Sequence, residues 1–173
     1  MARMIGLRPR PEHGPEVIAL WRHPRVIPTL WPTSAGPTDA EVDRINERTI
    51  DHWERYGFGP WILRDRATGA MVGRGGLART HVAGRDEVEV QWAIVPERWG
   101  EGLATELARA ATEVAFTDVK LTEIVAFTLP DNIASRRVME KAGFVYEQET
   151  EYAGLLHVLY RLRADARARF SGT

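Results

Sequence analysis

The spacing of apolar residues changes after the first third of the chain. The stretch "GPEVIALWRHPRV" carries a short apolar stripe that ends near Pro24. A loop rich in Pro, Gly, Ser and Thr follows, "WPTSAGPTDA". Apolar side chains then recur every three or four positions up to the glycines of "RYGFGP", which predicts an amphipathic helix capped by Thr38 or Asp39. The first third is therefore predicted to be helical and rich in loops.

Strand and helix patterns alternate in the remainder of the chain. Apolar residues alternate with polar ones in "EVEVQWAIVP", which is typical of a strand with one apolar face, and Pro96 ends it. The expected elements are two strands within 61–80 around a turn at 67–69, a strand over 87–95, a helix over 103–117, a strand over 123–129, a helix within 131–144 and strands over 144–152 and 156–163. Asp131 or Asn132 is the expected cap of the last helix, and Gly143 fits its left-handed stop. This order predicts an α/β fold with a mixed sheet.

Composition narrows the class of protein. A chain of 173 residues with 44% hydrophobic and 27% charged residues fits one soluble domain, residues 1–173. The absence of cysteine excludes disulfides, thiolate nucleophiles and cysteine-bound zinc. A formal net charge of −1 predicts neither a nucleic-acid nor a membrane partner. No apolar run reaches membrane-spanning length and the N-terminus does not read as a signal peptide, so a cytoplasmic protein is expected.

The segment "RWGEGLATELARAA" places two glycines directly before a strong helix former. The first turn of a helix leaves N–H groups unpaired and carries a partial positive charge. Gly100, Gly102 and the small Ala104 would let an anionic group approach these N–H groups closely. The spacing matches neither an ATP P-loop nor a dinucleotide-binding G-x-G-x-x-G. The segment therefore predicts a phosphate cradle, and the alternative is a plain turn between strand and helix.

Together with a second block, this loop resembles the GCN5-related N-acetyltransferases (GNAT). In that family a Q/R-x-x-G-x-G/A loop holds the pyrophosphate of acetyl-CoA, and here Trp99 stands where Gln or Arg is usual. The second block, N-x-x-S-x-x-x-x-x-K-x-G-F, is matched by Asn132, Ser135, Lys141, Gly143 and Phe144. The two blocks cover residues 86–147. The branch that they resemble includes the ribosomal-protein alanine acetyltransferases.

The resemblance implies a GNAT fold, with a mixed, mostly antiparallel sheet that is flanked by helices and splayed between the fourth and fifth strands. It also implies acetyl-CoA as co-substrate, with its acyl-pantetheine arm entering the splay like an added strand. The implied cofactor-binding residues are Ile94, Val95, Trp99, Gly100, Glu101, Gly102, Leu103, Ala104, Thr105, Asn132 and Ser135. No His pair has a metal-site spacing, and the chemistry needs no metal.

Acyl transfer to an amine sets the remaining requirements. A lysine-type amine has a pKa of about 10.4, which is about 3.4 units above pH 7. Converting it to the neutral form at pH 7 therefore costs about 4.6 kcal/mol. Glu89 is the first candidate for the base, and a solvated strand glutamate is the alternative. Ser135 or Tyr160 could protonate the leaving thiolate. The resemblance implies that an N–H near Ile94 stabilises the oxyanion.

Candidate acceptor-binding residues are Trp31, Glu89 and His157, although His157 also fits a core position. The predicted function is an N-acetyltransferase that moves the acetyl group of acetyl-CoA to a primary amine, on a protein N-terminus or a small molecule, by direct attack in a ternary complex. The alternative is a sensor or interaction module that binds acyl-CoA without turnover. The acceptor stays open, as does the choice between a monomer and a homodimer.

Overall fold

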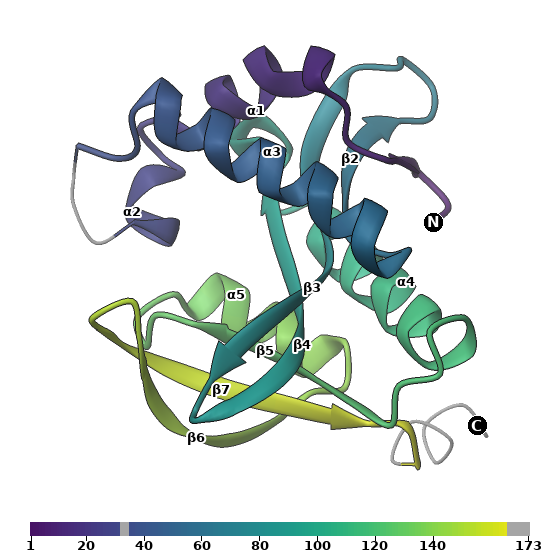
Figure 1. The fold of residues 1–173 in the computed structure, drawn as a ribbon, viewed down its shortest axis with the longest axis vertical. Helices are drawn as coiled ribbons and strands as arrows, with labels where there is room; N and C mark the ends of the chain where they lie inside the picture. The colour runs from purple at the N-terminus through teal and green to yellow at the C-terminus, as the bar shows by residue number, and fades with distance from the viewer. Residues whose placement is uncertain (32–34, 166–173) are drawn as a thin grey trace.

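The computed structural model describes residues 1–31 and 35–165, so residues 32–34 of the predicted loop lie outside the described residues. Its centre is a seven-stranded sheet with the order β1-β2-β3-β4-β5-β7-β6 (Figure 1). Neighbouring strands are antiparallel, except for β4 and β5, which are parallel. The strands are β1 (Met4–Leu7), β2 (Pro60–Asp65), β3 (Met71–Val82), β4 (Arg85–Ile94), β5 (Glu123–Thr128), β6 (Val145–Tyr152) and β7 (Leu155–Arg163).

Helices cover both faces of this sheet. The first face packs against α1 and α3 through a buried cluster that includes Val17, Val42 and Ile62, while the second packs against α4 and α5 through a cluster that includes Ala108 and Met139. The helices are α1 (Gly14–Trp21), α2 (Ile27–Leu30), α3 (Asp39–Tyr56), α4 (Leu103–Thr117) and α5 (Ile133–Lys141), with short 3-10 turns η1 (Pro11–His13) and η2 (Pro96–Arg98). The predicted α/β architecture is confirmed. None of the described helices has the length and apolar character needed to cross a membrane.

Local signals in the sequence explain where the helices begin and end. The Thr38 hydroxyl accepts a hydrogen bond from the N–H of Glu41, whose carboxylate accepts one from the N–H of Thr38, which forms a capping box at the start of α3. Gly57, with a φ of 71°, provides the left-handed residue that ends α3. The predicted cap at Thr38 is therefore confirmed.

The first strand is missing from the sequence-based prediction. β1 pairs with β2 over four residues, from Met4 opposite Asp65 to Leu7 opposite Ile62. Met4 is 1% exposed and belongs to the core beneath the sheet, whereas Ile5 and Leu7 are exposed. A strand of four residues with one buried side chain is too short to show the alternation of apolar and polar residues that identifies a strand in a sequence.

β4 and β5 form a fork. Among the described residues their ladder has one register pair, Glu89 opposite Val125, although β4 continues to Ile94 and β5 to Thr128. Beyond Glu89 the two strands diverge toward the start of α4. The predicted splay is confirmed, and its apex lies at Glu89.

Candidate active site

The start of α4 presents a row of free backbone N–H groups. Gly100 has a φ of 84° and Gly102 a φ of 79°, which turns the chain sharply from η2 into the helix. Among the described residues, none accepts a hydrogen bond from a backbone N–H of residues 100–105. Gly100, Glu101 and Gly102 are also exposed. The loop thus has the donors and the open space that an anion needs.

Side chains around the loop fix its shape. The Trp99 indole N–H donates to the carbonyl oxygen of Ile94 at 2.7 Å. Arg98 donates to Glu101 at 2.8 Å and to Asp65 at 3.0 Å, and the hydrogen bond from Arg98 lowers the pKa of Asp65 to about 2. The Glu101 side chain is therefore held by Arg98 and its carbonyl oxygen by Arg3, while its backbone N–H has no acceptor among the described residues.

Backbone groups of β4 face the fork at alternate residues. The N–H of Val95 donates to the carbonyl of Val72 at 3.0 Å, so Val95 points its hydrogen-bonding groups toward β3. In an antiparallel ladder the neighbouring residues point theirs the other way, which turns the N–H groups of Ile94 and Trp92 toward the fork. The N–H of Ile94 is thus turned toward the fork, while that of Val95 is turned away from it.

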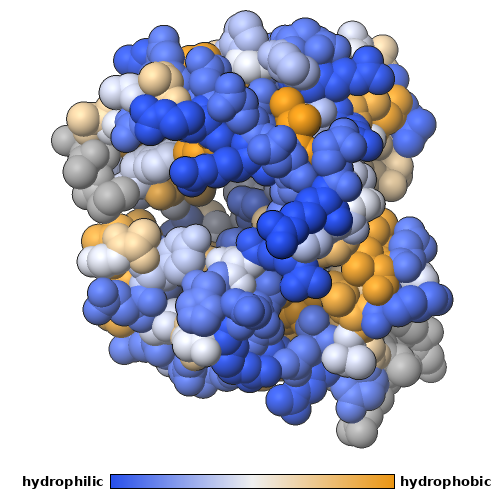
Figure 2. All heavy atoms as spheres, viewed as in Figure 1, coloured by the Kyte–Doolittle hydropathy of each residue, from blue (hydrophilic) through white to orange (hydrophobic). Residues whose placement is uncertain are grey.

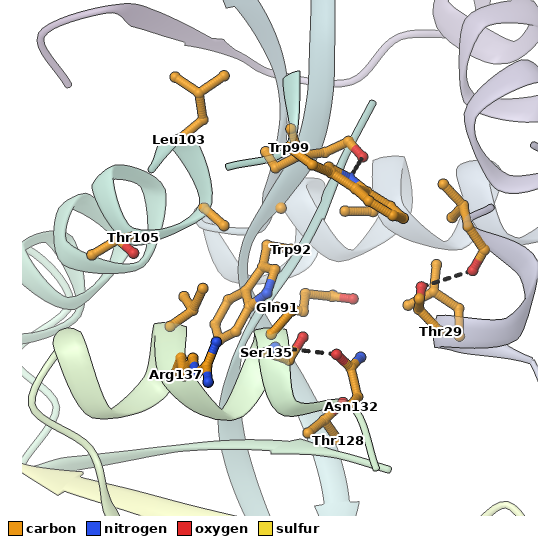
Figure 3. Close-up of a pocket in the computed structure, with 18 of the residues that line it drawn as sticks. Thr29, Gln91, Trp92, Trp99, Leu103, Thr105, Thr128, Asn132, Ser135 and Arg137 are labelled. Carbon is orange, nitrogen blue, oxygen red and sulfur yellow. Dashed lines mark hydrogen bonds between the residues drawn. The ribbon is translucent and has the colours of Figure 1, made fainter. Parts of the chain in front are cut away.

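One cavity joins the loop, the fork and the first helices. It has a volume of about 440 Å³ and is lined from the start of α4, past β4, to Trp21 and Leu30. Figure 2 shows the surface hollowed between the part that carries α1 to α3 and the part that carries α5, β6 and β7. Ser135 lines this cavity at the start of α5, where its N–H donates to Oδ1 of the capping residue Asn132 at 3.1 Å (Figure 3).

Glu89 lines this cavity at the apex of the fork. Among the described residues no group forms a hydrogen bond with its carboxyl, and burial raises its pKa to about 8. Glu87, two residues earlier on the same face, is instead paired with Arg161 at 2.9 Å. Glu89 is thus half-buried where it lines the cavity, and Glu87 is buried in a paired cluster.

The other candidates from the sequence lie outside this cavity. Tyr160 is 2% exposed, and its hydroxyl accepts from Arg136 at 3.2 Å and donates to Glu140 at 3.4 Å, in a separate hollow. His157 packs against the ring of Phe127, which does line the cavity, and Trp31 packs edge-on against Trp21 at 5.6 Å between ring centroids. The structure therefore brings Glu89 and Ser135 together around the fork, but not Tyr160.

Sequence reasoning missed Arg74. It lies in β3 opposite Ala93 and lines the cavity on the face covered by α1 and α3. A signal was present in "MVGRGGL", because a single arginine inside an apolar strand is unusual unless it has a partner or a role. Gln91 of β4 also lines the cavity and was read only as a strand residue, whereas Trp92, which lines it too, is one of the tryptophans that the sequence offers for an acceptor pocket.

Residues 3–145 match the family described as Acetyltransferase (GNAT) domain. The chain belongs to this family. The uncharacterized protein YkkB of Bacillus subtilis (strain 168) is 32% identical over 111 residues, which cover 61% of this chain and 64% of that protein. The chain thus spans less than two thirds of the length of this relative.

Solved structures share the whole architecture. The acetyltransferase from Agrobacterium tumefaciens str. C58 has a TM-score of 0.79 at 21% identity, with 93% of this chain and 91% of that chain covered. The aminoglycoside acetyltransferase AAC(6')-Ib in complex with coenzyme A has a TM-score of 0.76 at 18% identity, with 98% and 99% covered. At such identities the likeness is one of fold. The ribosomal-protein alanine branch stays a prediction.

Proposed function

We propose that this protein is an N-acetyltransferase that moves the acetyl group of acetyl-CoA directly to a primary amine. The observation that carries the proposal is a single cavity that joins free amides at the start of α4 to an open fork between β4 and β5. Free amides suit the pyrophosphate, and the free N–H groups along β4 suit the amides of the pantetheine arm. The coenzyme A complex of AAC(6')-Ib, which shares this fold, supports the same co-substrate.

The chemistry follows from the groups at the fork. The amine nitrogen donates its lone pair to the thioester carbonyl carbon, and the oxyanion that forms accepts a hydrogen bond from the N–H of Ile94. Collapse of the tetrahedral intermediate breaks the C–S bond, and the electron pair leaves on sulfur. The hydroxyl of Ser135 protonates this thiolate and regains its proton from water. Tyr160 has no part in this mechanism, since its hydroxyl lies in another hollow.

Glu89 receives the proton that the amine must lose. A carboxylate at the apex of the fork lies on the acceptor side of the sheet, with Gln91 and Ala93 on the same face. Its raised pKa of about 8 brings its basicity closer to that of an amine than an ordinary carboxylate allows. Proton transfer can run directly or through one water molecule in the cavity.

Release of CoA thiol tests the activity. The protein is incubated with acetyl-CoA and a panel of primary amines that includes small amines, amino acids and peptides with a free N-terminus, and the thiol is measured with a chromogenic reagent. We expect amine-dependent release and a matching acetylated product in the mass spectrum. Acetyl-CoA binding without release across the panel would instead favour the non-catalytic module.

Substitution of the loop glycines tests the cofactor site. Glu at position 100 or 102 places a carboxylate where the pyrophosphate is expected, and we expect Gly100→Glu and Gly102→Glu to weaken acetyl-CoA binding at least about 100-fold, or about 2.8 kcal/mol. Gly100 is the cleaner site, because Arg3 lies 3.8 Å from a Cβ at Gly102. Gly84→Glu is the matched control, since Gly84 has a φ of 74° and open space, but lies in the β3–β4 turn. Unchanged calorimetric affinity in both loop variants would remove the loop from the site.

A further inference from the structure

Arg74 is a buried cation without an anion. It is 4% exposed and lines the cavity. Its Nη2 donates to the Thr49 hydroxyl at 2.8 Å, and its guanidinium carbon lies 4.6 Å from the ring centroid of Trp21. Among the described residues no carboxylate pairs with it, and burial alone lowers its pKa to about 10, so it stays charged at neutral pH. Buried charges are ordinarily paired, which makes this one exceptional.

Unused donors surround Arg74. Among the described residues, four buried side-chain polar atoms have no hydrogen-bond partner, and three of them are the N–H groups of Arg74 Nε, Trp21 Nε1 and Trp31 Nε1. These three residues are contiguous, because Arg74 stacks on Trp21 and Trp21 contacts Trp31. The fourth atom is Oδ1 of Asn46, one turn before Thr49 on α3. A group of donors that lacks acceptors is complementary to an anion.

The charges along the cavity also favour an anionic ligand near Arg74. Among its lining residues, Glu89 is the one acid, whereas Arg74, Arg98, Arg137 and Lys141 are cations. Arg98, Arg137 and Lys141 belong to η2 and α5, near the loop where the pyrophosphate is expected. Arg74 is separate, since it lies on the face covered by α1 and α3. A polycationic acceptor would meet Arg74 without a carboxylate to offset it.

Resting on the proposed function, we propose that the acceptor is a primary amine that also carries a carboxylate, and that Arg74 and the Trp21 indole N–H bind this carboxylate while the amine lies at the fork. Arg74 presents a planar, charged donor set, which suits the two oxygens of a carboxylate. Glu89 and Arg74 are then the two poles of the acceptor site, because Glu89 lies four residues along β4 from Ala93, the register partner of Arg74. The amine is directed to Glu89 and the carboxylate to Arg74.

Matched pairs of acceptors test the proposal. ω-Amino acids of two to six carbons and the α-amino acids are each assayed beside the corresponding amide, so that only the carboxylate charge changes. We expect at least one free acid to exceed its amide in kcat/KM by about 10- to 100-fold, as befits hydrogen bonds to a charged group. Aminoalkyl phosphonates of the same lengths distinguish a carboxylate site from a general anion site, and a preference for the phosphonates would overturn the assignment of a carboxylate.

Variants at position 74 link this preference to the residue. We expect Arg74→Met to bring the ratio of acid to amide in kcat/KM close to one, through a larger loss for the free acids than for the amides. Arg79→Met is the matched control, because it removes an exposed cation from the same strand, outside the cavity. If Arg74→Met does not fold, Arg74→Gln replaces it. A preference that survives in a folded variant, or free acids and amides of equal activity in the wild type, would overturn the proposal and leave ordered water as the partner of these donors.

Binding separates this proposal from the proposed function. Calorimetry with the best free acid, in the presence of CoA, measures the carboxylate site without any turnover. Binding to the wild type that is lost in Arg74→Met, with no thiol release for any amine, would retain the anion site and reject the transferase. Acetylation of amines with no dependence on the carboxylate would retain the transferase and reject the anion site.

Discussion

Two buried arginines on the same face of the sheet have opposite surroundings. Arg161, on β7, is 7% exposed and pairs with Glu87, Glu123 and Glu147. Arg74, on β3, is 4% exposed and pairs with no carboxylate among the described residues. The two side chains are therefore similarly buried, and they differ in whether carboxylates offset their positive charge. Carboxylates offset the charge of Arg161, whereas no described carboxylate offsets the charge of Arg74. An anionic ligand would supply the missing negative charge.

The same contrast separates two glutamates on β4. The carboxylate of Glu87 accepts a hydrogen bond from Arg161, whereas that of Glu89 has no hydrogen-bond partner in the part of the chain that the structure describes and lines the cavity. Burial lowers the pKa of Arg161, but the hydrogen bonds to Glu87 and Glu147 outweigh it and raise that pKa, so Arg161 stays charged. Uncompensated groups are expensive to bury, and their presence on one side of the fork marks the side where ligands act.

The largest expected effect is on catalysis at Glu89. Glu89→Gln removes the base, and we expect kcat/KM to fall by about 100- to 10,000-fold with acetyl-CoA affinity unchanged. With an alkylamine of pKa about 10.4 as acceptor, wild-type kcat/KM should rise with pH until Glu89 is ionised, at a pH of about 8. In the variant kcat/KM should instead keep rising up to pH 9 without levelling near pH 8, because only the neutral amine reacts and its fraction grows up to its own pKa. Steady-state kinetics from pH 6 to 9 measures both effects.

Glu87→Gln is the control for this prediction. It removes a carboxyl from the same face of β4, only two residues away, but from the paired cluster. We expect its kcat/KM to stay within about threefold of wild type at a temperature where it is folded. Equal losses in the two variants would show that position 89 acts through the fold and not as a base.

The next largest effect concerns stability and compares the two arginines directly. Arg161→Met removes the buried cation that Glu87, Glu123 and Glu147 share. The exposed Arg85 still contacts Glu87 and Glu123, so we expect the free energy of unfolding to fall by about 3 kcal/mol, the lower end for a broken buried pair. Arg74→Met removes a charge that no carboxylate of residues 1–31 or 35–165 offsets, so the change should be a loss of no more than about 1 kcal/mol, or a gain. Urea denaturation monitored by tryptophan fluorescence measures both. A loss in Arg74→Met as large as that in Arg161→Met would make Arg74 a structural residue.

Much of the cofactor side could be read from the sequence, because it depends on backbone. Gly100 and Gly102 signal positive φ, and the predicted helix over 103–117 has the same bounds as α4. Asn132 and Gly143 likewise signal the two ends of α5. Each of these signals is local, so it survives without knowledge of the fold. The short strand β1 was missed since its pairing partner lies about sixty residues away along the chain.

The acceptor side could not be read in the same way, because it depends on partners. Glu87 and Glu89 look alike in "EVEVQW", and only the position of Arg161 on β7 distinguishes them. Tyr160 was a reasonable acid by residue type, but its side chain lies on the face opposite Glu89. Arg74 was overlooked because its distinguishing feature is that no carboxylate among the described residues pairs with it. Whether a charged side chain has a partner depends on the fold and cannot be read from a local sequence motif.

The smallest expected effect is the pH dependence of stability. Burial raises the pKa of Glu89 in the folded protein to about 8, above its ordinary value of 4.5, so between these values the folded protein holds a proton that the unfolded chain has lost. The contribution of Glu89 to stability is thus fully present below about pH 4.5 and is lost as the pH rises through about 8. Glu89→Gln has no such dependence. Its stability relative to wild type should increase between pH 5 and pH 9, on the order of 1–2 kcal/mol after allowance for water that reaches the carboxyl through the cavity.

Urea denaturation of the wild type and Glu89→Gln at both pH values measures this difference. Glu151→Gln is the matched control, because it removes an exposed carboxyl from β6, and its stability relative to wild type should change little between the two values. A difference for Glu89→Gln that is flat with pH would mean that its carboxyl titrates as it does in the unfolded chain. Glu89 would then resemble a surface glutamate in its energetics, and the contrast between the two sides of the fork would rest on Arg74 alone.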